Sequence, residues 1–420
     1  MIVSSTLCHR KHVCNRILGR ALVAVGGLAC IWSQAATAQS RTDTFWDATA
    51  THVPRAGKLH ALDAQFVDVD EDGDLDVVLA VEGDVNRLYL NDGQGRLSWR
   101  KRAFGSVAHD TEHVSSADFN RDGHADVMFI AEDDHVHQLF LGDGKAGFTD
   151  VSDRLPARSE GNGFALGDVN GDGWVDVVLG NSAERGQNFL WLGDPARAGF
   201  FIDATATHLP AVNDSTQGIA LADLDADGDL DMVVANEVPP NRLLLNDGRG
   251  RFTEASDRLQ LPVELHTREV HVFDATSDGK PDILFLNLTS NAGARERDPQ
   301  ARLLVNDGNG RFLDETAARL PGNSFSSWGG AVVDFNGDGH RDLIVGAIEV
   351  PGFKPLQARA YVNDGKGHFK DVTAEVMPAT TVGRSWSTAV GDLNGDGKDD
   401  VFIGGWGTQA RLLLRVAGKE

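Results

Sequence analysis

The stretch Leu221–Asn236 reads LADLDADGDLDMVVAN and places five aspartates at alternate positions within nine residues. Carboxylates this close together repel one another unless a cation compensates their charge. Apolar residues flank the acidic run on both sides, and such short apolar runs are typical of strands. The stretch therefore predicts two strands joined by an acidic loop that requires a cation.

The acidic pattern is repeated along the chain. Asp-x-Asp/Asn-x-Asp-Gly-x-x-Asp occurs at intervals of 50 to 60 residues, with Thr276 in place of the third-position acid or amide in the fifth copy. A repeat of this length predicts an array of equivalent structural units. The seven copies begin at Asp68, Asp118, Asp168, Asp223, Asp274, Asp334 and Asp392.

Each repeat is interpreted as four strands. One strand leads into the acidic loop, a second leaves it, and a third ends at a turn such as LNDGRG at Leu245–Gly250. The fourth begins with phenylalanine, as in FIDATATHLP from Phe201. Asn-Asp-Gly between apolar runs indicates a hairpin, because Asn and Gly tolerate a positive φ.

The two ends of the repeat region are complementary. The last repeat ends with the strand RLLLRV from Arg411 and lacks a Phe-x-Asp strand, whereas FWDATATHVP from Phe45 precedes the first complete repeat. An N-terminal strand that completes the C-terminal blade would close a ring and remove an open sheet edge. We therefore predict an all-β fold over residues 39–420, a seven-bladed β-propeller of four-stranded blades. An open solenoid, the alternative, would not explain the complementary ends.

Residues 1–38 are expected to lie outside this fold. Four basic residues precede the apolar run Ala21–Trp32, which is too short to span a bilayer. An Ala-x-Ala sequence ends at Ala38 and matches a signal-peptide cleavage site. We expect cleavage after Ala38, a secreted or periplasmic protein, and no transmembrane segment. Acylation of Cys30 is an alternative.

The charge balance limits the partners. The chain has a formal net charge of −23, and residues 1–38 contain four basic and no acidic residues, which leaves −27 for the remainder. This surplus argues against electrostatic binding to nucleic acid or to an anionic membrane. All three cysteines lie within residues 1–38, so the predicted mature protein has no disulfide.

Calcium gives a physical reason for grouping the acids. It takes six to eight oxygen ligands, and an Asp/Asn-rich loop that turns tightly at glycine can surround it. Positions 1, 3, 5 and 9 of each loop would supply side-chain oxygens, and position 7 its backbone carbonyl. Magnesium fits less well because it requires compact octahedral geometry. We expect up to seven Ca²⁺ ions, with the weakest site at the loop of Thr276.

The candidate metal-ligating residues follow from this numbering, with position 7 included in each loop. They are Asp68, Asp70, Asp72, Asp74, Asp76, Asp118, Asn120, Asp122, His124, Asp126, Asp168, Asn170, Asp172, Trp174, Asp176, Asp223, Asp225, Asp227, Asp229, Asp231, Asp274, Thr276, Asp278, Lys280, Asp282, Asp334, Asn336, Asp338, His340, Asp342, Asp392, Asn394, Asp396, Lys398 and Asp400.

DVNGDGWVDVVLGN at Asp168–Asn181, together with the LNDGxGxF stretches that follow such loops, resembles FG-GAP/VCBS repeats. Repeats of this type build the propeller of integrin α chains, and the resemblance extends from about Phe45 to the C-terminus. It implies a calcium-binding seven-bladed propeller, with metal loops on one face and partner recognition on the opposite face. A monomeric, secreted bacterial form is expected.

Two classes of function remain open. No nucleophile elbow, P-loop, zinc-protease helix or dinucleotide loop is recognisable, so no catalytic residue is assigned. The first hypothesis is a binding or adhesion module for an extracellular or envelope protein or glycan. The alternative is a calcium-dependent carbohydrate-active enzyme, a polysaccharide lyase or hydrolase. Its candidate residues are His113, His266, Arg268 and Glu269.

Positions equivalent between repeats indicate a ligand face. The residues six positions before each first aspartate are chemically diverse, which is unlike a core position: Leu62, Glu112, Asn162, Gln217, Arg268, Trp328 and Trp386. With the loop that follows the second strand, they suggest a recessed site in which tryptophans stack on a ligand. The predicted face comprises Arg268, Trp328, Trp386, Trp406, Glu82, Glu132 and Glu237. The alternative is that the tryptophans fill gaps between blades.

Overall fold

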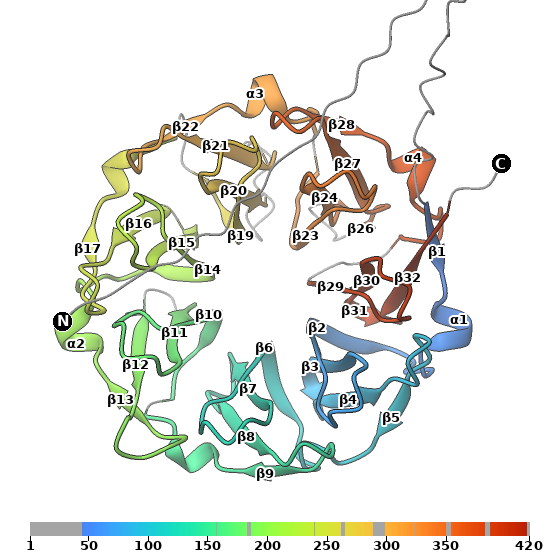
Figure 1. The fold of residues 1–420 in the computed structure, drawn as a ribbon, viewed down its shortest axis with the longest axis horizontal. Coiled ribbons are helices and arrows are strands. Elements are labelled where there is room, and N and C mark those ends of the chain that lie inside the picture. The colour runs from blue at the N-terminus through green and yellow to red at the C-terminus, as the bar shows by residue number, and fades with distance from the viewer. Residues whose placement is uncertain are drawn as a thin grey trace, which may run out of the picture. The chain divides into compact units, whose positions relative to one another are not determined.

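The repeats form small antiparallel sheets arranged around a common centre in a propeller-like, all-β architecture (Figure 1). The computed structural model describes residues 44–156, 158–182, 186–238, 240–261, 265–288, 299–323, 325–349, 354–382 and 387–417. These residues belong to one unit, 41–420. None of the helices described is long and apolar enough to cross a membrane. The predicted signal peptide, 1–38, lies outside the described residues.

Most repeats contribute four strands in the predicted order. The strands are β2 (Leu59–Val67), β3 (Asp76–Asp84), β4 (Arg87–Leu90) and β5 (Ser98–Arg100); β6 (His109–Ala117), β7 (Asp126–Ala131), β8 (Gln138–Gly142) and β9 (Phe148–Asp150); β10 (Gly161–Gly167), β11 (Asp176–Asn181), β12 (Phe189–Gly193) and β13 (Phe201–Asp203); β14 (Ser215–Ala222), β15 (Asp231–Val238), β16 (Arg242–Leu245) and β17 (Thr253–Glu254); β19 (Thr267–Phe273), β20 (Asp282–Asn287), β21 (Arg302–Asn306) and β22 (Phe312–Asp314); β23 (Gly330–Val333), β24 (Asp342–Val345), β27 (Arg359–Asn363) and β28 (Phe369–Asp371); β29 (Thr388–Gly391), β30 (Asp400–Ile403) and β32 (Arg411–Val416).

Short elements connect these sheets. Single helical turns follow the outer strands at α1 (Thr49–His52), α2 (Thr205–His208), α3 (Thr316–Arg319) and α4 (Thr373–Val376), with 3₁₀ turns at η1 (Ser152–Arg154) and η2 (Ser256–Arg258). The remaining strands are β18 (Leu259–Gln260), β25 (Ile348–Glu349), β26 (Lys354–Pro355) and β31 (Gly405–Thr408). Three strand pairs join neighbouring repeats: β3 with β6, β2 with β31, and the parallel pair of β18 with β22.

The N-terminal strand completes the sheet of the last repeat. β1 (Thr44–Asp47) pairs antiparallel with β32, in register from Thr44 opposite Val416 to Asp47 opposite Leu413. The Ala48 N–H extends the pairing by donating to the Leu412 carbonyl at 2.9 Å. The pairing predicted from the complementary chain ends is therefore present, and it joins residues more than 360 positions apart.

The hydrophobic core lies between successive sheets. One cluster combines Met128 and Ile130 of β7 with Leu179 of β11 and Trp191 of β12, and all four side chains are fully buried. Similar clusters join the other neighbouring repeats. Because each sheet buries both faces against its neighbours, the second strands are continuous apolar runs rather than alternating ones. This packing fixes the two ends of each inner strand, where the candidate sites lie.

Candidate functional site

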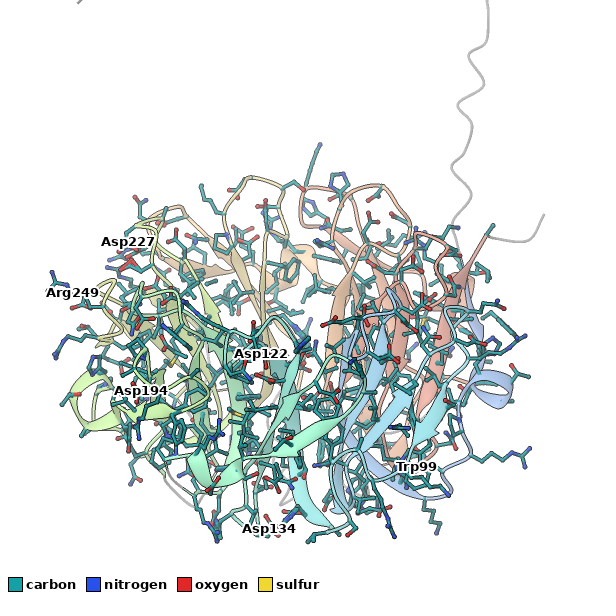
Figure 2. The ribbon with its side chains drawn as sticks, turned by 60° about the horizontal axis from the view of Figure 1, so that its bottom comes forward. Trp99, Asp122, Asp134, Asp194, Asp227 and Arg249 are labelled. Atoms are coloured by element: carbon teal, nitrogen blue, oxygen red, sulfur yellow. The ribbon has the colours of Figure 1, made fainter. Side chains whose placement is uncertain are left out.

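The acidic loops are closed by hydrogen bonds to their own backbone. In the second loop, Asp118 accepts from the N–H groups of Asp122 and Gly123 at 3.1 and 2.9 Å, and Asp122 accepts from His124 at 2.9 Å. Equivalent bonds recur in the other loops, and Figure 2 marks Asp122 and Asp227 in two of them. Glycine at position 6 adopts a positive φ, as at Gly228 (φ +99°). Each loop is therefore folded by contacts within the motif, and the spacing of the motif residues specifies these contacts.

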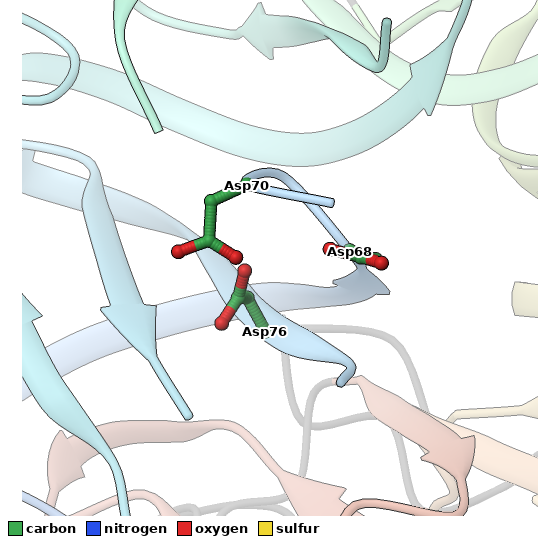
Figure 3. Close-up of side chains that lie close together, drawn as sticks. All are labelled: Asp68, Asp70 and Asp76. Atoms are coloured by element: carbon green, nitrogen blue, oxygen red, sulfur yellow. The ribbon is translucent and has the colours of Figure 1, made fainter. Parts of the chain in front are cut away.

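Two loops bring three carboxylates together. One oxygen each from Asp68, Asp70 and Asp76 lies within 4.8 Å of the others, and Figure 3 shows the three side chains close together. Asp223, Asp225 and Asp231 form the same arrangement in the fourth loop. These are positions 1, 3 and 9 of the two loops richest in acids. The position 5 carboxylate instead caps the backbone of position 7.

The geometry of these two loops fits a cation. The Oδ1 atoms of Asp70 and Asp225 are buried, and neither has a hydrogen-bond partner in the protein. A buried carboxylate oxygen without a donor is costly, and a divalent ion bound by oxygen ligands would remove that cost. Burial raises the pKa of Asp70, and the like charges of Asp72 and Asp68 raise it further. The residues present therefore fit a Ca²⁺ ion, which Asp68, Asp70 and Asp76 would hold through their side chains in the first loop.

The aspartate at position 9 also anchors the loop. Asp76 Oδ2 accepts from the Val69 N–H at 3.2 Å, and its Oδ1 accepts from the Asn91 N–H at 2.9 Å. Burial raises the pKa of Asp76 to about 7, although these two hydrogen bonds lower it. The same backbone pattern holds Asp126, Asp176, Asp231, Asp282 and Asp400. Position 9 thus links each loop to the third strand of its own sheet.

The Asn-Asp-Gly turns contact the acidic loop of the preceding repeat. The asparagine amide donates to the carbonyl of the second loop residue, and the last glycine of the turn packs on the third. A Cβ at Gly310 would lie 2.8 Å from the Asp225 Cβ, so only glycine fits there. The amide contacts are Asn91 to Leu393 (2.7 Å), Asn246 to Val169 (2.8 Å), Asn306 to Leu224 (2.9 Å) and Asn363 to Ala275 (2.8 Å). Turns predicted only as hairpins therefore also join neighbouring repeats.

Asp225→Ala is expected to cost more stability in calcium than Thr276→Ala. Asp225 contributes a buried carboxylate oxygen to a three-carboxylate cluster, whereas Thr276 offers no charge to the fifth loop. Loss of one ion held at a hundredfold excess over its Kd corresponds to about 2.7 kcal/mol. Thermal melts with calcium and with chelator measure both effects. With chelator the two variants should differ little, because only the weak ion pair of Asp225 with Arg258 at 3.4 Å is lost. Equal losses in calcium would contradict the assignment.

At the opposite end of the inner strands, β-bulges turn side chains toward the centre. In five repeats, the first strand changes its register with the second strand of the same sheet at an equivalent position. These first strands are β2, β6, β10, β14 and β19. A bulge inserts one residue and redirects its side chain. The inserted residues are Leu62, Glu112, Asn162, Gln217 and Arg268, which are members of the diverse set found by aligning the repeats. The bulge explains how this position can vary while the strand pairing continues on both sides of it.

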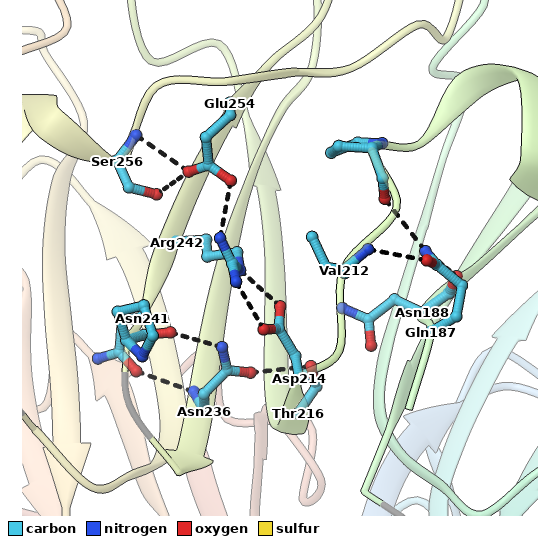
Figure 4. Close-up of polar contacts among 12 residues, drawn as sticks. Gln187, Asn188, Val212, Asp214, Thr216, Asn236, Asn241, Arg242, Glu254 and Ser256 are labelled. Carbon is cyan, nitrogen blue, oxygen red and sulfur yellow. Dashed lines mark hydrogen bonds and ion pairs between the residues drawn. The ribbon is translucent and has the colours of Figure 1, made fainter. Parts of the chain in front are cut away.

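Buried polar side chains hold the bulges in place. Thr216 precedes the bulge of β14 and donates from Oγ1 to Asn236 Oδ1 at 2.9 Å (Figure 4). The Asn236 N–H donates to Asn241 Oδ1 at 2.8 Å, and the Asn241 amide donates to Thr267 Oγ1 of the next repeat at 2.7 Å. All of these residues are buried. The network fixes two successive bulges relative to each other.

Four of the five bulged residues, Leu62, Glu112, Gln217 and Arg268, line a central cavity of about 200 Å³. Arg268 reaches across it, with Nη2 3.5 Å from Glu112 Oε2 on a strand 156 residues away, and donates from Nη1 to Gln217. The guanidinium also lies over the Trp328 ring, 5.4 Å from its centroid. Glu112 is 6% exposed, and burial raises its pKa to about 8 despite the charge of Arg268.

Two carboxylate–histidine pairs complete the cavity lining. Asp63 Oδ2 lies 3.3 Å from His113 Nδ1 and accepts from the Val114 N–H at 3.0 Å, while its Oδ1 accepts from Ser387. Glu269 lies 3.2 Å from His271. Burial opposes protonation of both histidines, but the hydrogen bonds and charges of their carboxylate partners raise the pKa of each. Sequence reasoning missed Asp63 and Ser387, although aligning the repeats one position later would have identified both.

The structure distributes the predicted ligand face over several places. Trp328 lines the cavity beside Arg268, and it is also 4% exposed and packs with Leu288 and Ile348. Trp406 donates to Glu82 at 2.5 Å and lies outside the cavity lining. Trp386 lies outside the described residues.

The remaining predicted acids lie near the cavity. Glu132 accepts from the Asn162 amide at 3.0 Å, and burial raises the pKa of Glu237. Of the residues considered for catalysis, His113, Arg268 and Glu269 line the cavity, whereas His266 is buried elsewhere.

The sequence matches the model of the FG-GAP-like repeat in six segments, residues 68–129, 118–179, 168–234, 223–285, 291–345 and 354–403. The chain belongs to the FG-GAP repeat family. These segments include every acidic loop, so each loop described above lies within a segment that matches the FG-GAP-like repeat.

Known relatives share this region. Cartilage acidic protein 1 of Xenopus tropicalis is 32% identical over 235 residues, and that of Homo sapiens is 31% identical over 236 residues; each match covers 53% of this chain and 33% of the relative. Integrin alpha pat-2 of Caenorhabditis briggsae is 28% identical over 242 residues, which cover 47% of this chain and 18% of the integrin. The matched region thus spans about a third or less of these curated relatives.

Solved structures with little sequence identity share the fold. An ancestral GH74 enzyme superimposes with a TM-score of 0.57 at 12% identity, over 87% of this chain and 48% of that chain. BBS1N, solved in complex with ARL6DN, superimposes with a TM-score of 0.53 at 10% identity, over 89% of this chain and 97% of that chain. At such low identity these matches show a shared fold alone and carry no statement of activity.

Proposed function

We propose that this FG-GAP protein is a secreted, calcium-stabilised propeller of seven four-stranded blades that acts as a binding or adhesion module. Seven acidic loops at near-equal spacing and the pairing of β1 with β32 support a closed ring of seven blades. The pattern of residues 1–38 supports export, with cleavage after Ala38. Calcium is supported by the converging carboxylates and the buried oxygens of Asp70 and Asp225.

The binding site of this proposal is the central cavity, and the partner is an extracellular or envelope protein or glycan. The observation that carries it is the set of bulges, because they direct unlike side chains from separate repeats into one cavity. Arg268, Glu112 and Gln217 meet there although they come from three different inner strands. A recessed site with a few fixed polar groups is typical of ligand recognition. Metal loops and cavity occupy opposite ends of the same strands, so calcium supports the site without touching the ligand.

Arg268→Ala is expected to reduce capture of the native partner at least tenfold while the melting temperature in calcium stays nearly unchanged. Loss of a buried, oriented arginine at an interface typically costs more than 1 kcal/mol. The measurement is affinity capture from the native organism with the calcium-loaded mature chain, followed by a melt of the same preparation. Arg249→Ala, an exposed residue on the turn beside the metal loops, is the matched control. If Arg268→Ala captured the partner as well as the unmodified protein does, the cavity would not be the partner-binding site.

A second candidate function is calcium-dependent carbohydrate cleavage in the same cavity. It is favoured by Glu112, whose pKa of about 8 keeps a proton available near neutral pH, as a general acid requires. Incubation of the protein with a panel of polysaccharides tests for cleavage products. Cleavage that depends on Glu112 would replace the binding module by an enzyme.

A further inference from the structure

We propose that the outer edge of the first complete repeat is a second binding surface and that its ligand is an anionic polysaccharide. The surface, here called the basic edge, consists of Trp99 and Arg100 of β5 and of Lys101 and Arg102 in the turn that follows. Figure 1 shows β5 on the outer side of its sheet, and Figure 2 labels Trp99. The inference does not depend on the proposed role of the central cavity, which the inner strands line.

The sequence of this repeat departs from that of the others. Each of the other outer strands ends in an acid whose carboxylate accepts from the backbone N–H two residues later and caps the following turn. These acids are Asp47, Asp150, Asp203, Glu254, Asp314 and Asp371. Trp99 takes this place in β5, because it lies opposite Tyr89 as Glu254 lies opposite Leu244 in its own repeat. The capping acid is therefore missing, and Arg-Lys-Arg follows.

The loss of the acid also changes the partner of the arginine on the third strand. In the fourth repeat, Arg242 pairs with Glu254 at 2.9 Å. In the first complete repeat, the equivalent Arg87 lies over the Trp99 ring, 4.4 Å from its centroid, and Lys101 lies 5.3 Å from the same centroid. The face of an aromatic ring attracts a cation. Trp99 thus holds two cations where another repeat has an ion pair.

The three cations that follow Trp99 are available to a ligand. All three are exposed, and among the residues that the structure describes no ion pair or side-chain hydrogen bond engages them. Residues 93–109 contain four Lys or Arg residues and no acid, in a chain with a net charge of −23. Asp84 lies next to Arg87 and pairs with it at 3.0 Å. The basic edge is therefore a local positive surface on an acidic protein.

The turn that carries these cations is held in place by the next repeat. Phe104 is 3% exposed, and its ring packs against Phe129 and Phe148 at 4.9 and 4.8 Å between centroids. The Gly105 N–H donates to the Arg102 carbonyl at 3.3 Å, and Arg102 adopts a φ of +64°. Glycine or asparagine fits this conformation better, so the backbone gives no reason for an arginine there. A fixed turn also reduces the entropy lost on binding.

The position of the basic edge selects among polyanions. Charges at physiological ionic strength interact over about 8 Å, so a narrow run of cations acts only on a molecule that touches it. A bilayer or a nucleic-acid duplex is broad and would also approach the acidic remainder of the protein. A single polysaccharide chain is thin enough to follow one strand edge. Its carboxylates or sulfates match the arginines, and half-buried Trp99 offers an apolar surface to a sugar ring.

The test is surface plasmon resonance of the calcium-loaded chain 39–420 on immobilised polysaccharides, in salt of about 150 mM. Dextran sulfate carries sulfates, hyaluronan carries carboxylates, and dextran carries no charge. Saturable binding to at least one anionic polysaccharide is expected, with at least tenfold weaker binding to dextran. A preference for one of the two identifies which anionic group the basic edge recognises.

Neutralising the basic edge should weaken this binding at least tenfold. The variant combines three changes: Arg100→Gln, Lys101→Gln and Arg102→Asn. Asparagine is chosen at the last position because it tolerates a positive φ. The control variant removes the same charge from exposed turns of other repeats and should bind as the unmodified protein does: Lys145→Gln, Arg249→Gln and Arg311→Gln. Melting in calcium checks that both variants are folded.

The salt dependence gives a second measurement. Each charge neutralised on a single-stranded polyanion contributes roughly 0.7 to the slope of log K against log salt, so loss of three cations should lower the slope by about two. The control variant should keep the slope of the unmodified protein. An unchanged slope in the variant of the basic edge would contradict the inference.

Equal losses of affinity in the two variants would show that net charge governs binding and would overturn the inference. Equal binding to dextran, or no binding to either anionic polysaccharide, would overturn it as well. Tighter binding to poly-glutamate or to phosphatidylglycerol vesicles would assign the basic edge to an acidic protein segment or to a membrane. Binding that survives in the variant of the basic edge but requires calcium would place the polysaccharide at the metal loops. Partner capture through the cavity is measured separately, so failure of either proposal leaves the other standing.

Discussion

Removal of calcium is expected to lower the melting temperature of the mature protein by about ten degrees or more. Each ion that binds only the folded chain adds about 2.7 kcal/mol at a hundredfold excess over its Kd, and two loops already bring three carboxylates together. Without the ion, the buried oxygens of Asp70 and Asp225 lose their only compensation. Melting followed by circular dichroism in calcium, magnesium and chelator measures the effect. Magnesium should stabilise far less, and a melting curve indifferent to chelation would rule out structural calcium.

The same measurement has a defined pH dependence. Burial raises the pKa of Asp76, Asp176 and Asp400 to about 7, well above the 3.8 of an exposed aspartate. A raised pKa in the folded state favours the protonated native form, so this contribution is fully present below about pH 4 and is lost as the pH rises to about 7. Calcium favours the ionised form instead. The difference in melting temperature between calcium and chelator should therefore widen from pH 5 to pH 8; a constant difference would show that these carboxyls do not take part.

Deletion of Arg41–Ala50 is expected to destabilise the whole repeat domain by more than about 5 kcal/mol, although it removes no metal ligand. The deletion strips β1 from β32, and with it the ion pair of Asp47 with Arg411 at 3.0 Å. It also removes the buried Phe45 ring, which packs against Phe335 at 6.1 Å between centroids. Burial of one such side chain contributes about 1.5–3 kcal/mol, and the lost strand hydrogen bonds add to it. The sheet would then expose an open edge.

Urea denaturation of the truncated and intact mature chains measures this loss. Trp46→Ala is the matched control within the same strand, because Trp46 is 47% exposed and its loss should cost little. A synthetic peptide of residues 41–50 added in trans should restore part of the stability. Equal stability of the truncated and intact chains would mean that β1 does not hold the ends of the repeat region together.

The acidic loops could be predicted from sequence because their contacts are local. Asp118 bonds to backbone groups four and five residues away, so the spacing of the motif specifies the loop almost completely. The pairing of β1 with β32 could be predicted for a different reason. If the repeats form a ring of equivalent units, the extra strand at the N-terminal end pairs with the last repeat, which lacks one strand. Neither the loops nor this pairing required knowledge of how far apart the repeats lie in space.

The roles of the tryptophans could not be predicted in this way. Trp328 and Arg268 occupy equivalent positions in their repeats, which indicated that they lie on the same face. The alignment does not say whether a side chain at that position contacts a ligand or fills a gap between sheets. Trp328 lies under the Arg268 guanidinium, and its ring both lines the cavity and packs with Leu288 and Ile348. The inter-repeat contacts of Asn246 and Asn306 were likewise unforeseen, since a hairpin turn needs the same residues whether or not it touches its neighbour.

Sequence spacing was sufficient for the number of loops, the strand order and the pairing of the chain ends, because each depends on short-range or repeated contacts. The cavity depended on the tertiary structure. Arg268 meets Glu112 only because bulges in two strands 156 residues apart direct both side chains to the centre of the same arrangement of sheets. The resulting burial moves the pKa of Glu112 to about 8. No local pattern encodes that encounter, since it is set by how far the packed sheets hold their inner strands apart.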